Sequence, residues 1–148
     1  MLTKPEYDWE CIDFLVNEGP AFLFHENKIY ITYSASGTGV PYAVGLLTAE
    51  RGSDLLNKDS WTKSPVPVFK TCVENGQYGP GHNSFTKSED GTEDLMIYHC
   101  RNYTEIKGDP LFDPNRHARV GVVKWTADGP DFGVPEPDSL WTPTTTDV

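Results

Sequence analysis

The chain has 148 residues, among them seven Tyr and four Trp, which is enough length and aromatic content for one folded domain with a core. Its formal net charge of −10, with no cluster of Lys or Arg, argues against nucleic acid or an anionic membrane as a partner. No apolar run approaches the roughly 20 residues that cross a bilayer.

Six strand-like runs follow one another along the chain, separated by turn residues. The runs are residues 21–25, 28–36, 42–49, 83–87, 94–101 and 118–125. Only residues 53–61 could form a helical turn or two. The 13 Gly and 12 Pro also suit a loop-rich β protein better than a helical one. The sequence therefore predicts an all-β fold.

The six runs repeat as two triplets, and a polar segment that could supply a short outer strand follows each triplet. A repeat of about 60 residues with three or four antiparallel strands is typical of a β-propeller blade. We expect a blade over residues 16–72 and another over 73–135, between the end of a preceding blade (1–15) and a C-terminal tail (136–148). Because propellers have at least four blades, the chain would hold two to three blades of a larger ring. Two unrelated meanders in a β-sandwich are the alternative.

Three cysteines, Cys11, Cys72 and Cys100, are odd in number and lack a CxxC spacing. Neither a disulfide framework nor a zinc site is therefore indicated. Reduced thiols favour a cytoplasmic location.

In a propeller, the first strand of each blade lines the central channel. Counting back from Phe22 and Phe85 aligns Glu18 with Gly81 and Gly19 with His82. The repeat therefore predicts a carboxylate and an imidazole that project near the same channel mouth from neighbouring blades.

Four segments in order along the chain carry a resemblance to a known family. "VNEGPAFL" (16–23), "YGPGHNSF" (78–85) and "DPNRHARVGVVKW" (113–125) resemble signature segments of glycoside hydrolase family 43, and "DGPDFGVPEP" (128–137) resembles its usual ending. Members of this family are five-bladed propeller enzymes, chiefly arabinofuranosidases, arabinanases and β-xylosidases. The resemblance implies an inverting glycosidase that acts on arabinofuranosyl linkages, with xylosyl linkages as the alternative.

The resemblance also implies roles for individual residues. Glu18 matches the general acid that protonates the departing glycosidic oxygen. His82 matches the histidine at the propeller centre, which in several relatives helps to hold a hydrated calcium ion or a water network. No other cofactor is implied. Arg116 best matches an arginine that contacts sugar, with Arg119 as the alternative; since the two fall on opposite faces of an extended strand, one of them should reach the site.

Two aromatic residues, Trp9 and Tyr33, are candidates for a sugar-stacking surface, although both positions are also common in cores. His99, on an expected central strand, suits a structural role better than a catalytic one.

An inverting glycosidase needs a second carboxylate, and the family's base is an Asp near the start of the first blade. That motif is not found in this chain. We therefore expect a C-terminal portion with the acid but without the base, inactive alone and prone to self-association or to pairing with an N-terminal half, because an open ring exposes strand edges. A non-catalytic carbohydrate-binding β domain and an inactive remnant are the alternatives.

Overall fold

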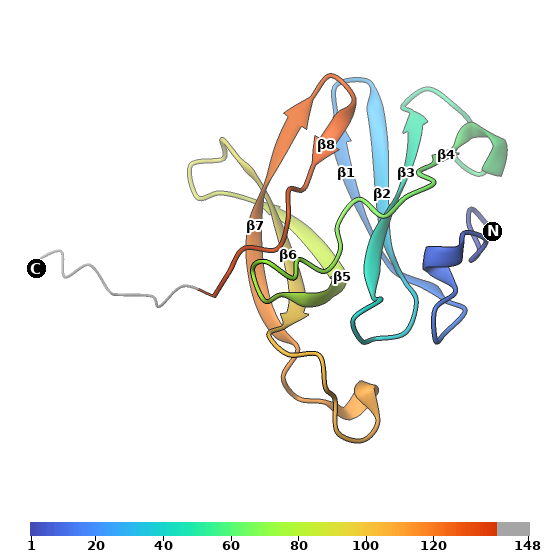
Figure 1. Ribbon diagram of the computed structural model, residues 1–148. Helices are drawn as coiled ribbons and strands as arrows, with labels where there is room; N and C mark the ends of the chain where they lie inside the picture. Colours follow the sequence, from blue (N-terminus) through green and yellow to red (C-terminus); the bar gives the residue numbers. More distant parts are fainter. Residues whose placement is uncertain (139–148) are drawn as a thin grey trace, which may run out of the picture.

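Eight β-strands form two four-stranded antiparallel sheets in the computed structural model, which describes residues 1–138 (Figure 1). The first sheet contains β1 (Asn17–His25), β2 (Lys28–Ala35), β3 (Ala43–Glu50) and β4 (Thr62–Lys63), in that order. The second repeats this order with β5 (Tyr78–Lys87), β6 (Asp94–Arg101), β7 (His117–Thr126) and β8 (Gly129–Asp131). The six expected strands are all present, and each triplet is followed by a short outer strand. Most of the expected tail, residues 139–148, lies outside the described residues.

Three short 3-10 helices interrupt the connections: η1 (Asp8–Glu10), η2 (Lys58–Ser60) and η3 (Pro110–Phe112). The helical turn expected within residues 53–61 is thus present only as η2. Asn57 and Asp109 begin η2 and η3, and each side chain accepts a hydrogen bond from a backbone N–H two residues later. Among residues 1–138, no helix is long and apolar enough to cross a membrane.

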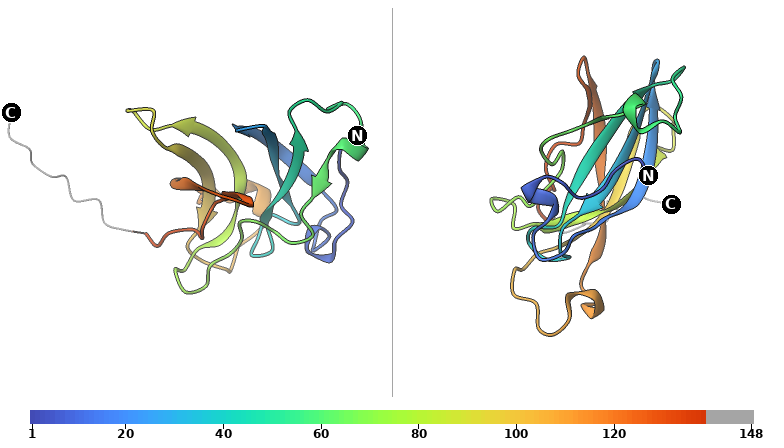
Figure 2. Two further views of the ribbon diagram at one scale, coloured as in Figure 1. Left: turned by 90° about the horizontal axis from the view of Figure 1, so that it is seen from above. Right: turned by 90° about the vertical axis from the view of Figure 1, so that its right-hand side faces the viewer.

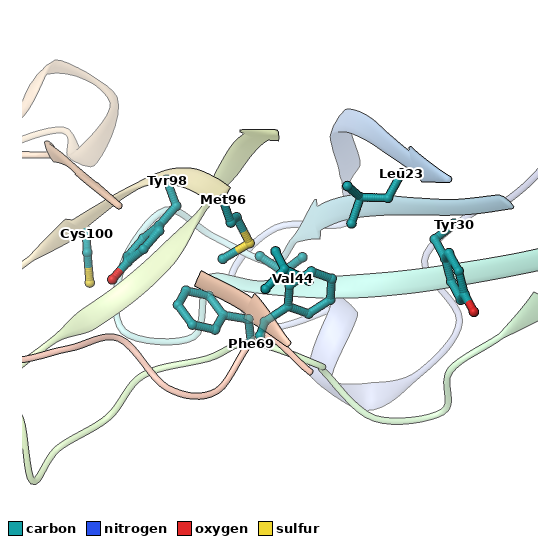
Figure 3. Packing of buried hydrophobic residues seen from close by; sticks show 9 residues of the cluster. Leu23, Tyr30, Val44, Phe69, Met96, Tyr98 and Cys100 are labelled. Carbon is teal, nitrogen blue, oxygen red and sulfur yellow. The ribbon is translucent and has the colours of Figure 1, made fainter. Parts of the chain in front are cut away.

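The main hydrophobic core lies between the two sheets (Figure 3). Leu23, Tyr30 and Val44 from the first sheet meet Met96 and Tyr98 from the second. Phe69, on the connection between the sheets, packs edge-on against Tyr98, with ring centroids 4.8 Å apart. Each sheet therefore buries one face against the other, as adjacent propeller blades do.

The innermost strands, β1 and β5, lie beside each other, and the sheets spread apart from there (Figure 2). The connections β2–β3 and β6–β7 lie at the same end as the start of β1, the lower end in Figure 1. This end of the molecule holds the candidate site.

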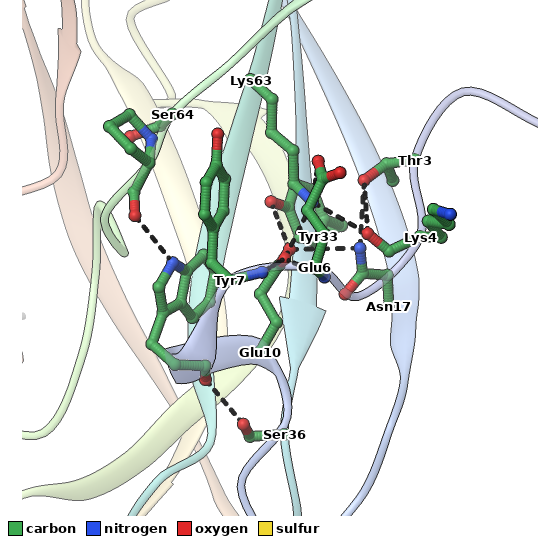
Figure 4. Close-up of polar contacts among 12 residues, drawn as sticks. Thr3, Lys4, Glu6, Tyr7, Glu10, Asn17, Tyr33, Ser36, Lys63 and Ser64 are labelled. Carbon is green, nitrogen blue, oxygen red and sulfur yellow. Dashed lines mark hydrogen bonds and ion pairs between the residues drawn. The ribbon is translucent and has the colours of Figure 1, made fainter.

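The N-terminal segment covers the other face of the first sheet, where Trp9 and Leu2 pack against a second cluster that contains Tyr33, Ala35 and Leu47. Glu10 fixes this segment, although its side chain is completely buried. Its carboxylate accepts hydrogen bonds from the Tyr33 hydroxyl (2.9 Å) and lies 2.8 Å from Lys63 Nζ (Figure 4). Burial raises the pKa of Glu10, but Lys63 and two backbone N–H groups outweigh that effect and hold the pKa below its usual value.

Candidate functional site at the start of the inner strands

Glu18 lies near the start of β1, where the pairing with β2 changes register between Glu18 and Ala21. The irregularity follows from Gly19, whose φ of +58° is in the left-handed region. Strand β1 thus begins within the "NEGP" motif itself rather than after it. The bulge leaves the Glu18 side chain half-buried, with 33% of its surface exposed, at the mouth of the strand.

His82 reaches Glu18 from the second sheet. Its Nδ1 lies 3.0 Å from Glu18 Oε2, and its backbone N–H donates to Ser34 Oγ at 2.7 Å. The His82 backbone has a φ of +48°, which is uncommon for a residue other than glycine. A side chain at Gly19 would come within 3.2 Å of the His82 ring, so glycine at that position allows the two strands to approach.

Tyr42 holds the other oxygen of Glu18 and was not expected from the sequence. Its hydroxyl donates to Glu18 Oε1, and only 4% of the residue is exposed. Burial, followed by the hydrogen bond to Glu18, raises the pKa of Tyr42, so that the hydroxyl stays protonated and acts as a donor. The ring occupies the space above Gly81, where a Cβ would lie 2.3 Å from a Tyr42 ring carbon.

The His99 ring stacks against the Tyr42 ring; the two rings are nearly parallel, with their centroids 5.5 Å apart. Neither buried ring nitrogen has a hydrogen-bond partner among the described residues. Burial and then the charge of Arg116 lower the pKa of His99 to about 4, so the ring is neutral near pH 7. The ring packs against Tyr42, and its structural role stays a prediction.

The two arginines of "RHAR" have different surroundings. Arg116 lies 3.5 Å from Thr38 Oγ1, and its charge also influences the pKa values of Tyr42 and His99. Arg119 instead donates to the Cys100 carbonyl (2.6 Å) and pairs with Asp138 (2.9 Å). The structure therefore places Arg116 beside the site and uses Arg119 to bind the C-terminal segment. Contact of either residue with sugar stays a prediction.

Trp9 and Tyr33 both lie in the second cluster, on the face of the first sheet that the N-terminal segment covers. Tyr33 is only 2% exposed, so it offers no ring face to a sugar, and the expectation that it forms a stacking surface is corrected: its ring is part of the core. The Trp9 indole N–H donates to the Pro65 carbonyl at 3.1 Å. Trp9 is half-buried, and a role for it in binding stays a prediction.

A calcium site near His82 does not fit the side chains that the structure describes. Within residues 1–138, no three His, Cys, Asp or Glu side chains gather in a way that could hold a metal ion. Calcium takes six to eight oxygen ligands, whereas His82 already has Glu18 at its Nδ1. A calcium ion here would need ligands from water or from another polypeptide, and it stays a prediction.

The fold is part of a β-propeller. It has two meandering sheets with adjacent inner strands, and a carboxylate–imidazole pair lies where those strands begin. Residues 1–130 match the profile of Glycosyl hydrolases family 43, and the chain belongs to that family. The chain is similar to an extracellular exo-α-(1→5)-L-arabinofuranosidase of Streptomyces avermitilis, with 54% identity over 94% of this chain and 29% of the relative. It is 50% identical to α-L-arabinofuranosidase 43 of Humicola insolens, over 93% of this chain and 29% of that protein.

The similarity extends to solved structures. The crystal structure of an α-L-arabinofuranosidase from Lactobacillus brevis superimposes with a TM-score of 0.93 at 56% identity, over 95% of this chain and 44% of that one. A thermostable family-43 glycoside hydrolase superimposes with a TM-score of 0.72 at 30% identity, over 94% of this chain and 43% of that one. The expected propeller fold is confirmed. The chain spans less than a third of the curated relatives' length and less than half of these solved chains.

Proposed function

We propose that this chain is the acid-bearing portion of an inverting glycosidase that removes terminal α-L-arabinofuranosyl groups. The two similar enzymes of Streptomyces avermitilis and Humicola insolens and the solved Lactobacillus brevis structure are all arabinofuranosidases, which supports an arabinofuranosyl substrate. Glu18 is the general acid in this proposal, and its proton passes to the oxygen of the departing sugar. Arg116 orients the arabinofuranosyl group beside it.

The observation that carries the proposal is the placement of Glu18 between two sheets. Tyr42 and His82 each engage one carboxylate oxygen, so the side chain has a fixed direction although a third of its surface is exposed. A general acid needs both properties, because it must be oriented toward the leaving oxygen and must be accessible to it. A carboxylate that only stabilised a turn would not need a partner from a second sheet.

The second carboxylate has to come from elsewhere in the ring. In an inverting glycosidase the base lies about 6.5–9.5 Å from the acid, across the sugar, and activates a water molecule. We propose that the rest of the propeller supplies this base, and that the chain alone turns over little or no substrate.

Combining the chain with the remaining part of the Lactobacillus brevis relative, and measuring hydrolysis of α-(1→5)-linked arabinobiose, tests the proposal. Glu18→Gln keeps the size of the side chain but has no proton to transfer, so kcat should fall by about 10²- to 10⁴-fold. An arabinofuranoside whose leaving group departs without a proton should be affected far less. Glu26→Gln, which alters an exposed carboxylate in the β1–β2 turn, is the matched control and should leave both rates unchanged.

Equal loss on both substrates would contradict the role of Glu18 as acid. Binding of arabinobiose by the isolated chain that survives Glu18→Ala, with no turnover in any combination, would favour the non-catalytic carbohydrate-binding domain instead.

A further inference from the structure

Tyr42 is held from several sides before it reaches Glu18. It lies in the connection between β2 and β3, and its backbone N–H donates to the Gly39 carbonyl at 3.2 Å. One ring face stacks on His99, and the ring occupies the space next to Gly81 of β5, where a Cβ would lie 2.3 Å from a Tyr42 ring carbon. A buried ring with these neighbours has a fixed position, so its hydroxyl is in place before any substrate arrives.

A second hydroxyl, that of Ser34 on β2, forms a hydrogen bond with the Tyr42 hydroxyl. Ser34 is completely buried, and its Oγ accepts the His82 backbone N–H at 2.7 Å, so its own proton remains to be donated. Burial and then the hydrogen bond to Glu18 raise the pKa of Tyr42, whereas the bond with Ser34 lowers it. A bond that lowers the pKa of a phenol is one that the phenol oxygen accepts. Ser34 therefore donates to Tyr42, and the Tyr42 proton is directed to Glu18.

These contacts form a chain of hydrogen bonds that run in one direction. The chain begins at the His82 backbone N–H, which donates to Ser34. It continues from Ser34 to Tyr42 and ends at Glu18 Oε1. Hydrogen bonds in such a chain polarise one another, which strengthens the last of them. Tyr42 is therefore a stronger donor to Glu18 than an isolated phenol would be.

The chain also determines which oxygen of Glu18 carries the acid proton. Oε1 accepts the Tyr42 hydroxyl, so the proton of the neutral carboxyl group belongs to Oε2, which lies 3.0 Å from His82 Nδ1. When this proton passes to a departing oxygen, the electron pair of the O–H bond stays on the carboxylate and negative charge spreads to Oε1. The Tyr42 bond then has a charged acceptor, and such bonds are roughly twice as strong as neutral ones. The bond consequently stabilises the transition state more than the bound substrate.

We propose that Tyr42 is a positioning residue that stabilises the Glu18 carboxylate while the proton passes to a poor leaving group, such as the hydroxyl oxygen of a sugar. The inference rests on the proposed function, because it takes Glu18 as the general acid. A sugar oxygen departs only with a proton, whereas a nitrophenolate departs without one. The contribution of Tyr42 should therefore depend on the leaving group, which simple packing in the site would not.

The test uses Tyr42→Phe in the chain combined with the remaining part of the Lactobacillus brevis relative. The variant keeps the ring and loses only the hydroxyl. On α-(1→5)-linked arabinobiose, kcat should fall by about 10- to 100-fold, the value of one hydrogen bond to a charged group, while KM should stay the same. On nitrophenyl α-L-arabinofuranoside, kcat should stay within about threefold of that of the unsubstituted protein.

Tyr30→Phe is the matched control, because Tyr30 is as buried as Tyr42, at 4% exposed, and packs beside Trp125 rather than in the site. It should leave both rates unchanged. A second measurement needs no turnover and uses the 148-residue chain alone. The ¹³Cζ resonance of Tyr42 should shift in Glu18→Gln, which replaces a charged acceptor by a neutral one, and the ¹³Cζ resonance of Tyr30 should not.

An unchanged kcat on arabinobiose, an equal loss on both substrates, a change confined to KM, or an unshifted Tyr42 resonance overturns the inference. The proposed function is judged separately by Glu18→Gln, whose selective loss on arabinobiose would uphold the general acid whatever the result for Tyr42→Phe. An equal loss on both substrates in Glu18→Gln, or the absence of turnover in every combination, overturns both.

Discussion

Glu18 and His82 are separated by 64 positions in sequence, and the position of His82 depends on two residues of the first sheet. Gly19 leaves room for the imidazole, and Ser34 on β2 accepts the hydrogen bond from the His82 N–H. The left-handed φ of +48° at His82 costs on the order of 1 kcal/mol or more. That cost is offset by contacts that this backbone geometry permits, which include the approach of His82 Nδ1 to within 3.0 Å of Glu18 Oε2.

His99 should make stability depend on pH. Its pKa in the folded protein is lowered to about 4, below the unfolded value near 6.5. As the pH falls, the unfolded chain therefore protonates His99 before the folded protein does. Neutral His99 makes its full contribution to the free energy of unfolding above pH 6.5, and that contribution is lost progressively as the pH falls toward 4. A difference of this size corresponds to a loss on the order of 3 kcal/mol in the free energy of unfolding. Urea denaturation at pH 7.5, 5.5 and 4.5 measures it.

His99→Gln is the control, because carboxylates with lowered pKa values, such as Glu10 and Asp94, also lose stabilisation in acid. The groups whose charge acts on His99, Arg116, His82 and Arg101, stay in place in this variant. The variant should lack the His99 part of the pH dependence. An identical pH profile for both proteins would contradict the lowered pKa.

At the residue level, the sequence located Glu18 and His82 through the repeat and the resemblance, but it did not identify Tyr42. Tyr42 precedes β3 in a connection without a motif, and its role depends on the missing side chain at Gly81, whose space its ring fills. A contact of this kind between a loop and another sheet leaves no periodic signal. For Tyr33, an aromatic residue at a strand position is equally consistent with core and with binding surface.

At the level of the elements, β5 begins with a strained turn that glycine makes possible. Gly79 has a φ of +62°, and a Cβ there would lie 2.2 Å from the Gly39 carbonyl oxygen on the β2–β3 connection. Gly79→Ala should therefore lower the free energy of unfolding by at least about 2 kcal/mol, from backbone strain and the steric clash together. Chemical denaturation followed by tryptophan fluorescence measures the change.

Gly76→Ala provides the comparison, since Gly76 also has a positive φ (+64°) but has no atom within 4 Å of an added Cβ. This substitution should lower the free energy of unfolding by only about 1 kcal/mol, the cost of a left-handed backbone conformation for alanine. Equal effects of the two substitutions would show that the close approach to Gly39 does not determine the geometry of β5.

The strands were predictable because their apolar residues alternate or run continuously and are bounded by turn residues. The bulges in β1 and β5 were not, because a register change depends on single φ angles at Gly19 and His82. The packing of residues 1–15 against the first sheet could not be predicted from the sequence either. It depends on Glu10, whose partners Tyr33 and Lys63 lie 23 and 53 positions away.

At the scale of the whole molecule, one face of the second sheet has no described partner within residues 1–138. Val120 and Val122 on β7 are 55% and 42% exposed, whereas Val123, on the other face of the strand, is buried in the core. In a complete ring this face would pack against the next blade. Addition of the remaining part of the Lactobacillus brevis relative should give a 1:1 complex and a thermal midpoint that rises with its concentration.

Sedimentation velocity and differential scanning calorimetry measure both effects. Val122→Asp should weaken the complex, because it places a charge in the proposed apolar contact. Leu56→Asp, at a position that is 94% exposed in the connection before η2, should not. A chain that stays monomeric with an unchanged thermal midpoint would contradict pairing. Self-association and cellular location stay predictions.

The Glu18–His82 contact joins two different sheets. Any rotation of one blade relative to the other therefore lengthens or shortens it, and a change of 1 Å is enough to break a hydrogen bond of 3.0 Å. The ¹⁵N chemical shifts of the His82 ring consequently report the angle between the blades. A spectroscopist could follow ring closure at this one imidazole, without substrate and without turnover.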